Sequence, residues 1–321
     1  MRASPVTKFL RRGFTLVELL VSVSVLALLV LMYVSFFDSA SRAWLAGAGN
    51  AERRRNARAL TDYIGSELKG AMLPVQIVAG TSTGNLQFVI NPSQVPSTYC
   101  SADCLFWQAP LATESTYGDI AEVGYFVKWD ETDPDNPRPA LCRFFINPST
   151  KDSTGAVSSN ANFLIYDSSP TKWLSSSLID TVAPATKDKS YLGLFGENVI
   201  GLWIRSYGLD GQELPRSFDS RTGYTCQFQS TDASGYKQSW TGQRYLPAKV
   251  VVSIAQVDDH YAQQLGNSAP ILRSLVNATS TRDASQFLTV LRQQATGSSL
   301  LSPILPGIRI YSTEVSLTNS Q

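Results

Sequence analysis

One histidine flanked by two aspartates is the group of residues in this chain that comes nearest to a metal or acid–base site. His260 is the only histidine among 321 residues, and it directly follows Asp258 and Asp259. Imidazole and carboxylate groups bind metals, but two adjacent aspartates in a strand point to opposite faces and do not converge. We interpret the segment as the solvated end of a strand, and we predict no metal site and no cofactor.

The chain lacks the short motifs of common catalytic sites. It contains no G-x-S-x-G, no H-E-x-x-H and no glycine-rich phosphate loop, and a Ser-His-Asp triad would depend on His260 alone. Tryptophans can line a sugar-binding or adhesive surface, but packing in the core and loops is the simpler interpretation. This applies to Trp107, Trp129, Trp173, Trp203 and Trp240. We therefore predict that the chain is not an enzyme.

Four cysteines offer disulfide chemistry. They are Cys100, Cys104, Cys142 and Cys226. All follow a long apolar run, which places them in an oxidising compartment if that run crosses a membrane. Four cysteines allow three connectivities, of which we predict Cys100–Cys104 with Cys142–Cys226. The C-x3-C spacing also suits a metal, but no histidine is near it and no second pair matches it.

A single carboxylate stands inside the apolar run. Residues 14–37 number 24, and Glu18 is the only ionisable group among them. A helix of this length spans about 36 Å, enough to cross the roughly 30 Å hydrocarbon core of a bilayer. Residues 1–13 carry four basic side chains and no acid, which predicts a cytoplasmic N-terminus and an exported C-terminal part. A charged side chain in such a helix has an unfavourable free energy of insertion and usually has a partner.

The residues around Gly13 are typical of a processing site rather than of an ordinary signal anchor. A secretory signal is cut after its apolar region at small residues, but Phe36, Phe37 and Asp38 follow this run. The block "RRGFTLVELL" instead resembles the type III signal of the type IV pilin and pseudopilin superfamily. That resemblance implies that a prepilin peptidase cuts between Gly13 and Phe14 and N-methylates Phe14. It also implies that Glu18 attracts the terminal amine of a neighbouring subunit during assembly.

Later blocks carry a second resemblance. "FWQAPL", "EVGYFVKW", "RPALCRFF", "ENVIGLWIRS", "LPAKVVVSIAQVDD" and "GIRIYSTEVSL" are similar to the prepilin-type family called Verru_Chthon cassette protein C. This implies partners among pilin-like subunits of the same cassette. The block "ALTDYIGSELKGAMLP" is also similar to minor pseudopilins of the J type and minor pilins of the W type. The apolar run lacks the proline of major pilins and the exported part is larger, which favours a minor subunit.

The sequence divides into a leader, an anchor, a stalk and an exported domain. We predict a cleaved leader over residues 1–13, a membrane helix over 14–37, an amphipathic helix over 38–72 and a β-rich domain over 73–321. The charge of +1 becomes −3 when the four basic residues of the leader are removed. A chain so close to neutral has no electrostatic footprint for nucleic acid, so we expect no nucleic-acid partner.

The hydrophobic pattern predicts an α+β fold of the pilin kind, with a long N-terminal helix packed on antiparallel sheet. An apolar stripe on the stalk helix consists of Ala57, Leu60, Ile64, Leu68 and Ala71. Strands are predicted within residues 85–90, 122–129, 140–146, 198–207, 248–257 and 307–317, the last with a bulge or bend near Ser312. The strands within 122–129 and 140–146 flank the turn "DETDPDNPRP" at residues 130–139 and are predicted to form a hairpin. Residues 148–162 and 217–242 are predicted to be surface loops, and residues 282–295 a helix.

Two classes of function agree with these features. The first is a minor pseudopilin, a structural subunit held in inner membrane lipid and assembled into a periplasmic pseudopilus or pilus-like secretion machine. The second is a minor type IV pilin displayed at the cell surface as a binding module for adhesion or DNA uptake. The near-neutral charge disfavours DNA.

Overall fold

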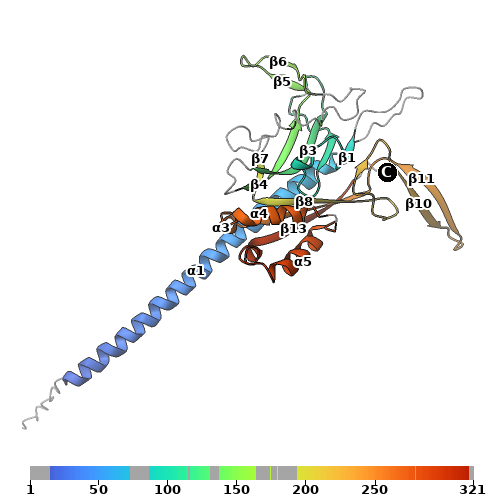
Figure 1. Ribbon diagram of the computed structural model, residues 1–321. Helices are drawn as coiled ribbons and strands as arrows, with labels where there is room; N and C mark the ends of the chain where they lie inside the picture. Colours follow the sequence, from blue (N-terminus) through green and yellow to red (C-terminus); the bar gives the residue numbers. More distant parts are fainter. Residues whose placement is uncertain are drawn as a thin grey trace, which may run out of the picture. The chain divides into compact units, whose positions relative to one another are not determined.

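The chain forms two compact units, residues Met1–Arg55 and Asn56–Gln321, and helix α1 (Leu16–Lys69) contributes to both (Figure 1). The computed structural model describes residues 15–72, 87–114, 116–130, 137–163, 174, 179, 194–278 and 280–317, without the side chains of 42, 43, 45–53 and 194. The predicted cleavage site at Gly13 and Phe14 lies outside the described residues, as do residues 131–136 of the predicted turn at 130–139.

The larger sheet of the second unit is antiparallel, with the strand order β7-β4-β3-β2-β1-β9. Its strands are β1 (Phe88–Ile90), β2 (Leu105–Ala109), β3 (Ala121–Asp130), β4 (Arg138–Ile146), β7 (Leu194–Glu197) and β9 (Phe218–Asp219). The predicted hairpin is confirmed, because β3 pairs with β4 without a register shift from Glu122↔Ile146 to Asp130↔Arg138. Both faces of this sheet are buried, which explains the nearly continuous apolar runs in these strands.

A smaller antiparallel sheet has the order β13-β12-β8. Its strands are β8 (Val199–Tyr207), β12 (Lys249–Val257) and β13 (Ile308–Ser316). The predicted bulge near Ser312 is wrong, because β12 and β13 pair without interruption. Ile308 and Ile310 pack on one face of this sheet, and Tyr311 and Val315 pack on the other. The alternation of apolar and polar residues shifts by one position within β13 because the first half of the strand is buried on one face of the sheet and the second half on the other.

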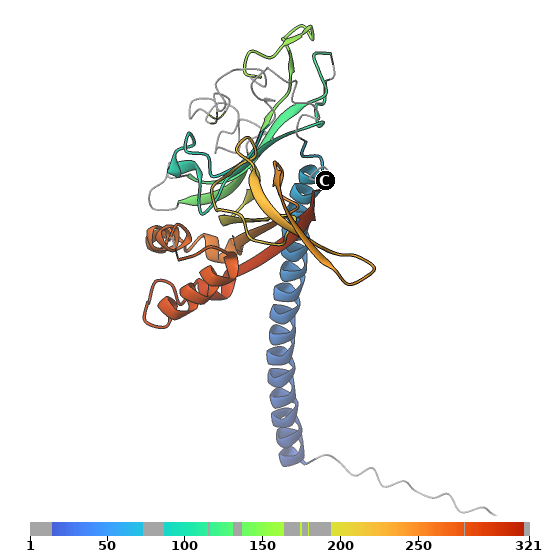
Figure 2. The same ribbon diagram turned by 90° about the vertical axis from the view of Figure 1, so that its right-hand side faces the viewer.

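Helices cover one face of the smaller sheet. They are α3 (Asp259–Ala262), α4 (Ala269–Val276) and α5 (Ala284–Ala295), with the short 3-10 turns η1 (Ser97–Tyr99), η3 (Gly266–Ser268) and η4 (Leu305–Gly307) elsewhere in the unit. The predicted helix over residues 282–295 is confirmed as α5, where the side chain of Asp283 caps the N-terminus and Phe287 and Leu291 are buried. In Figure 2 the smaller sheet lies between these helices and the end of α1.

The end of α1 completes the central core. Of the predicted stripe, Ala57, Ile64, Leu68 and Ala71 are buried and Leu60 is partly buried. Ile64, Leu68 and Ala71 share a core with inward-facing residues of both sheets, so the helix is sandwiched between them. The predicted α+β class, with a long N-terminal helix and antiparallel sheet, is confirmed.

Two segments predicted to be loops contain hairpins instead. Within residues 148–162, β5 (Ser149–Lys151) pairs with β6 (Val157–Ser159). Within residues 217–242, β10 (Tyr224–Thr231) pairs with β11 (Lys237–Arg244) over eight residues. Their serines, threonines and glutamines are mostly exposed on both faces, so these strands lack the apolar alternation that reveals a half-buried strand.

The same turn closes both hairpins. Asp152 and Asp232 each accept hydrogen bonds from the backbone two and four residues later and from the hydroxyl two residues later. Gly155 and Gly235 then adopt φ of 84° and 83°, a conformation that favours glycine. The Asp-x-Ser/Thr-Gly sequence at both tips is a turn signal that an analysis of serine and threonine content overlooks.

Candidate functional site

Glu18 lies in the first turn of α1. Its backbone N–H donates to Thr15 Oγ1 at 3.3 Å, and its carbonyl accepts from Ser22 Oγ at 2.7 Å. Its carboxylate has no partner among the described residues. The nearby hydroxyls of Ser22 and Ser24 bind backbone carbonyls of their own helix, so Glu18 is the charged group on an otherwise apolar helix surface.

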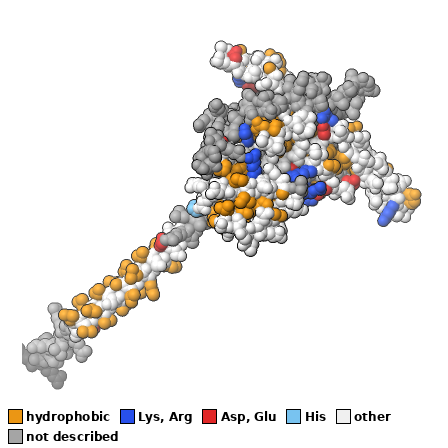
Figure 3. Space-filling view, in the orientation of Figure 1, with side chains coloured by type: hydrophobic (Ala, Val, Ile, Leu, Met, Phe, Trp, Pro, Cys, Tyr) orange, Lys and Arg blue, Asp and Glu red, His pale blue; other side chains and the backbone are white. Residues whose placement is uncertain are grey.

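The helix around Glu18 exposes an apolar surface on all sides. Residues Leu16–Ser41 have a mean hydropathy of 2.6 and are the described helix that is long and apolar enough to cross a membrane. Orange side chains cover this part of α1 in Figure 3. Water does not stabilise a helix that is hydrophobic all round, whereas hydrocarbon does. The segment is therefore suited to anchor the chain in a membrane by one N-terminal helix.

Comparison with known proteins identifies a motif at the same place. Residues 8–34 match the family model described as the prokaryotic N-terminal methylation motif. The match indicates a type IV pilin-like precursor. Such a precursor is processed by a prepilin peptidase and assembles with other pilins. Neither a curated protein nor a solved structure matches the chain. The matched motif ends within α1, so it carries no information on the sheets or on the cassette resemblance.

A buried ion pair joins the end of α1 to the larger sheet. Arg143 of β4 donates to Glu67 through Nη2 at 2.5 Å and through Nε at 3.2 Å. The two side chains are only 12% and 8% exposed. The hydroxyl of Tyr125 donates to the same carboxylate at 2.5 Å. Burial and the Glu67 charge raise the pKa of Tyr125 above its ordinary value of 10.0, so Tyr125 stays a neutral donor.

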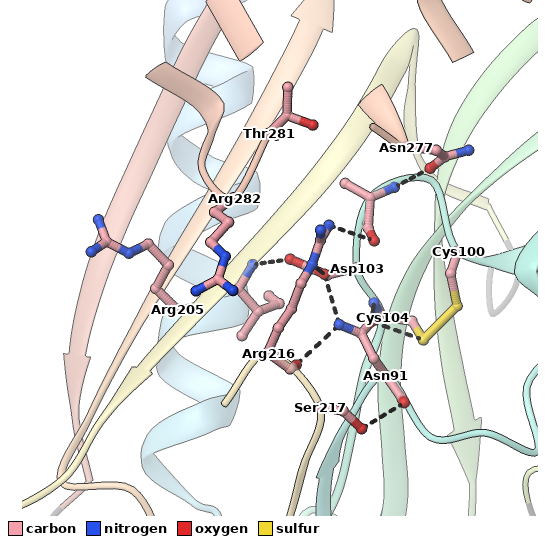
Figure 4. Close-up of polar contacts among 12 residues, drawn as sticks. Asn91, Cys100, Asp103, Cys104, Arg205, Arg216, Ser217, Asn277, Thr281 and Arg282 are labelled. Atoms are coloured by element: carbon pink, nitrogen blue, oxygen red, sulfur yellow. Dashed lines mark hydrogen bonds and ion pairs between the residues drawn. A yellow bond between two sulfur atoms is a disulfide. The ribbon is translucent and has the colours of Figure 1, made fainter. Parts of the chain in front are cut away.

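A second buried carboxylate lies beside the Cys100–Cys104 disulfide (Figure 4). Asp103 is fully buried. Its Oδ1 accepts from Arg216 Nε at 2.6 Å and from Asn91 Nδ2 at 2.7 Å, and its Oδ2 accepts from the backbone N–H of Ile204 at 2.9 Å. Asp103 belongs to the disulfide loop. Its three donors come from β8 (Ile204), the loop after β1 (Asn91) and the loop before β9 (Arg216). Asp103 therefore ties the two sheets together.

The disulfide loop is also tied to the helical face. Ala102, at φ 74°, donates its N–H to Asn277 Oδ1 at 2.8 Å and accepts from Arg216 Nη2 at 3.0 Å. Its neighbour Ser101 donates its hydroxyl to the carbonyl of Ile200 at 2.7 Å and accepts from Trp129 Nε1 at 3.2 Å. The loop is a structural junction, and its two sulfurs are bonded to each other.

The predicted pairing of Cys142 with Cys226 is wrong. Cys100 and Cys104 form a disulfide, but Cys142 and Cys226 are free and buried. Cys142 packs on the face of the larger sheet with Phe106, whereas Cys226 packs in the central core. The body of the sheet separates them. Burial raises the pKa of the Cys142 thiol to about 12, which makes it unreactive.

The remaining candidate residues have structural roles. Asp258 caps α3 by accepting from the N–H of His260 at 3.1 Å, and Asp259 accepts from Asn198 Nδ2 at 2.5 Å. No group of three metal-binding side chains is present among the described residues. Of the tryptophans, Trp107, Trp129 and Trp203 are buried, Trp240 is 50% exposed, and Trp173 is outside the description.

Sequence reasoning missed the roles of Glu67 and Asp103, two of the buried carboxylates in the described part of the chain. Glu67 had a visible signal, since it lies within the apolar stripe between Ile64 and Leu68 where a charge requires a partner. Asp103 had none, because its partners are 12 to 113 residues away in the chain. Both carboxylates hold elements in place.

Proposed function

We propose that the chain is a minor pilin-like structural subunit, a pseudopilin, of a periplasmic pseudopilus or pilus-like secretion machine. The observation that carries the proposal is the methylation motif over residues 8–34, with one carboxylate, Glu18, on an exposed apolar helix. Residues 1–13 are the leader, cleavage follows Gly13, and Phe14 becomes the methylated N-terminus. Residues 14–37 hold the subunit in the inner membrane, residues 38–72 form its stalk, and residues 73–321 lie in the periplasm.

Assembly depends on Glu18 in this proposal. An ionised carboxylate in hydrocarbon costs on the order of 3 kcal/mol on insertion scales. The methylated amine of Phe14 in a neighbouring subunit offsets that cost, because opposite charges attract strongly where the dielectric constant is low. Partners are other pilin-like subunits, including those of a cassette resembling Verru_Chthon cassette protein C.

The experiment separates insertion, cleavage and assembly. Glu18→Val removes the charge, so the subunit should be inserted and cleaved after Gly13 but should no longer crosslink to other subunits in vivo. Ser22→Ala is the matched control, because Ser22 lies one turn away on the same apolar helix. N-terminal mass spectrometry reports cleavage in the same cells. Normal crosslinking of Glu18→Val, or an intact Met1 on the native protein, would refute the proposal.

The second candidate is a surface-displayed minor pilin that binds a ligand. It is favoured by the exposed aromatic side chains of the β10–β11 hairpin, where Tyr236 is 64% and Trp240 is 50% exposed. Protease treatment of whole cells distinguishes the two candidates. Cleavage within residues 73–321 on intact cells indicates surface display, whereas cleavage only after the outer membrane is opened indicates a periplasmic subunit.

A further inference from the structure

A groove runs beside the β10–β11 hairpin in the second unit. Its volume is about 890 Å³, and it lies between residues 209–215 and residues 224–229 of β10. The hairpin extends from the body of this unit in both ribbon views (Figures 1 and 2). All of its lining residues lie within residues 209–229, far in the chain from the membrane helix and Glu18.

One backbone N–H group on the groove edge of β10 is already bonded. The backbone N–H of Gln227 donates to Asp210 Oδ2 at 3.3 Å instead of remaining available, and the other carboxylate oxygen accepts from the N–H of Gln212 at 3.1 Å. A peptide that binds by strand addition needs such edge N–H groups. An extended peptide that paired along this edge would therefore lack the Gln227 N–H as a partner.

The charges of the groove do not select an ionic ligand. The carboxylate of Glu213 is held by Arg205 at 2.6 and 3.2 Å, and the oxygens of Asp210 accept backbone N–H groups. No lysine or arginine is among the described residues that line the groove. An anionic ligand such as a nucleic acid would meet two carboxylates and no cation, and a cationic ligand would compete with Arg205.

The other polar side chains that line the groove are mostly neutral hydrogen-bonding groups. Gln212, Gln227 and Gln229 line the groove and are exposed, and their side-chain amides have no partner among the described residues. Tyr224 is buried, and its hydroxyl accepts from the N–H of Leu209 at 3.2 Å. The hydroxyl hydrogen of Tyr224 has no acceptor within the described part of the chain. Each amide offers two donors and one acceptor oxygen.

From these contacts we infer that the groove binds a neutral polysaccharide. A chain of hydroxyl groups offers donors and acceptors together, which matches paired amides and a tyrosine hydroxyl and requires no charge. The inference goes beyond the proposed structural role, because binding at this groove depends on neither Glu18 nor the membrane helix. A failure of the assembly experiment would thus leave it standing, and its own failure would leave assembly untouched.

The test uses the full chain in a detergent without a sugar headgroup. Titration calorimetry is run with two neutral polysaccharides, dextran and xyloglucan, and with anionic alginate. We expect at least one neutral polysaccharide to bind and alginate to bind at least tenfold more weakly. The double variant Gln227→Ala, Gln229→Ala should lose at least tenfold in affinity. Gln238→Ala is the matched control, an exposed glutamine on β11 outside the groove, and should bind as the native chain does.

A second, more conservative variant tests the same groove with less risk of misfolding. Tyr224→Phe removes one hydroxyl and keeps the ring, so it should weaken binding several-fold while the hairpin remains ordered by circular dichroism. Absence of binding to both neutral polysaccharides, stronger binding of alginate, or equal losses in the double variant and Gln238→Ala would each overturn the inference.

Discussion

Arg143 binds both carboxylate oxygens of Glu67, with Nη2–Oε1 at 2.5 Å and Nε–Oε2 at 3.2 Å. Glu67 lies in the last turns of α1 and Arg143 in the middle of β4, 76 residues apart. Bidentate pairs of this kind fix orientation as well as distance. The pair therefore fixes the orientation of the end of α1 on the larger sheet. Apolar contacts are not directional and would fix this orientation less strictly.

Glu67→Gln should destabilise the second unit by about 3 kcal/mol, because it leaves the mostly buried Arg143 without its counter-charge. The expected fall in Tm is about 6–12 °C for a domain of this size, measured by thermal unfolding of the full chain in detergent. Asp62→Asn, on an exposed position of the same helix, is the control and should leave Tm unchanged. A fall of the same size in both variants would mean that the pair has no special role.

The alkaline limit of stability should depend on Tyr125. Its pKa is raised above 10.0 in the folded chain by burial first and then by the Glu67 charge. The unfolded chain loses this proton near pH 10 while the folded chain keeps it, so the stabilisation is present below pH 10 and declines as pH rises beyond it. Urea unfolding between pH 8 and 11.5 should show this decline. Tyr125→Phe should reduce the slope, whereas Tyr117→Phe, at an exposed position, should not.

Asp103→Asn should loosen the junction of the two sheets. The change keeps the shape of the side chain but removes the charge that accepts from Arg216, Asn91 and Ile204. Hydrogen bonds to charged groups contribute about 1.5–3 kcal/mol each, and we expect a loss in that range in the free energy of unfolding. Asp119→Asn, on an exposed loop, is the control. An unchanged denaturation midpoint for Asp103→Asn would contradict the structural role.

Alkylation should distinguish the cysteines. In the folded chain without reductant no thiol should react, because Cys142 and Cys226 are buried. After unfolding without reductant two thiols should react, and after reduction four should. Intact mass spectrometry counts the alkyl groups. No reaction of the unfolded, unreduced chain would show that Cys142 and Cys226 are oxidised, and would restore the pairing predicted from the sequence.

Gly235→Ala should destabilise the β10–β11 hairpin without unfolding the unit. Gly235 has φ 83°, where a side chain costs roughly 1–2 kcal/mol. Two-stranded hairpins are marginally stable alone, so hydrogen exchange of the β10 and β11 amides should quicken by about tenfold or more while β12 stays protected. Gly297→Ala is the control, because Gly297 has open space around its Cα and no positive φ. Equal exchange in both variants would show that the turn conformation is unimportant.

Local patterns in the sequence predicted much of this chain. The apolar run with Glu18, the motif around Gly13, the stripe from Ala57 to Ala71 and the β3–β4 hairpin each depend on residues within one element or two adjacent ones. Hydrophobic period and charge are local properties, so they can be interpreted before the chain is folded.

The tertiary structure decided what depends on distant partners. Arg143 reaches Glu67, and Arg216 reaches Asp103 across 113 residues, and neither pairing has a signal in spacing. The same holds for Cys142 and Cys226, which are buried in separate clusters. The polar strands β10 and β11 were missed because no apolar face marks them. These long-range pairings follow from how the two sheets pack around the end of α1 and not from any local pattern.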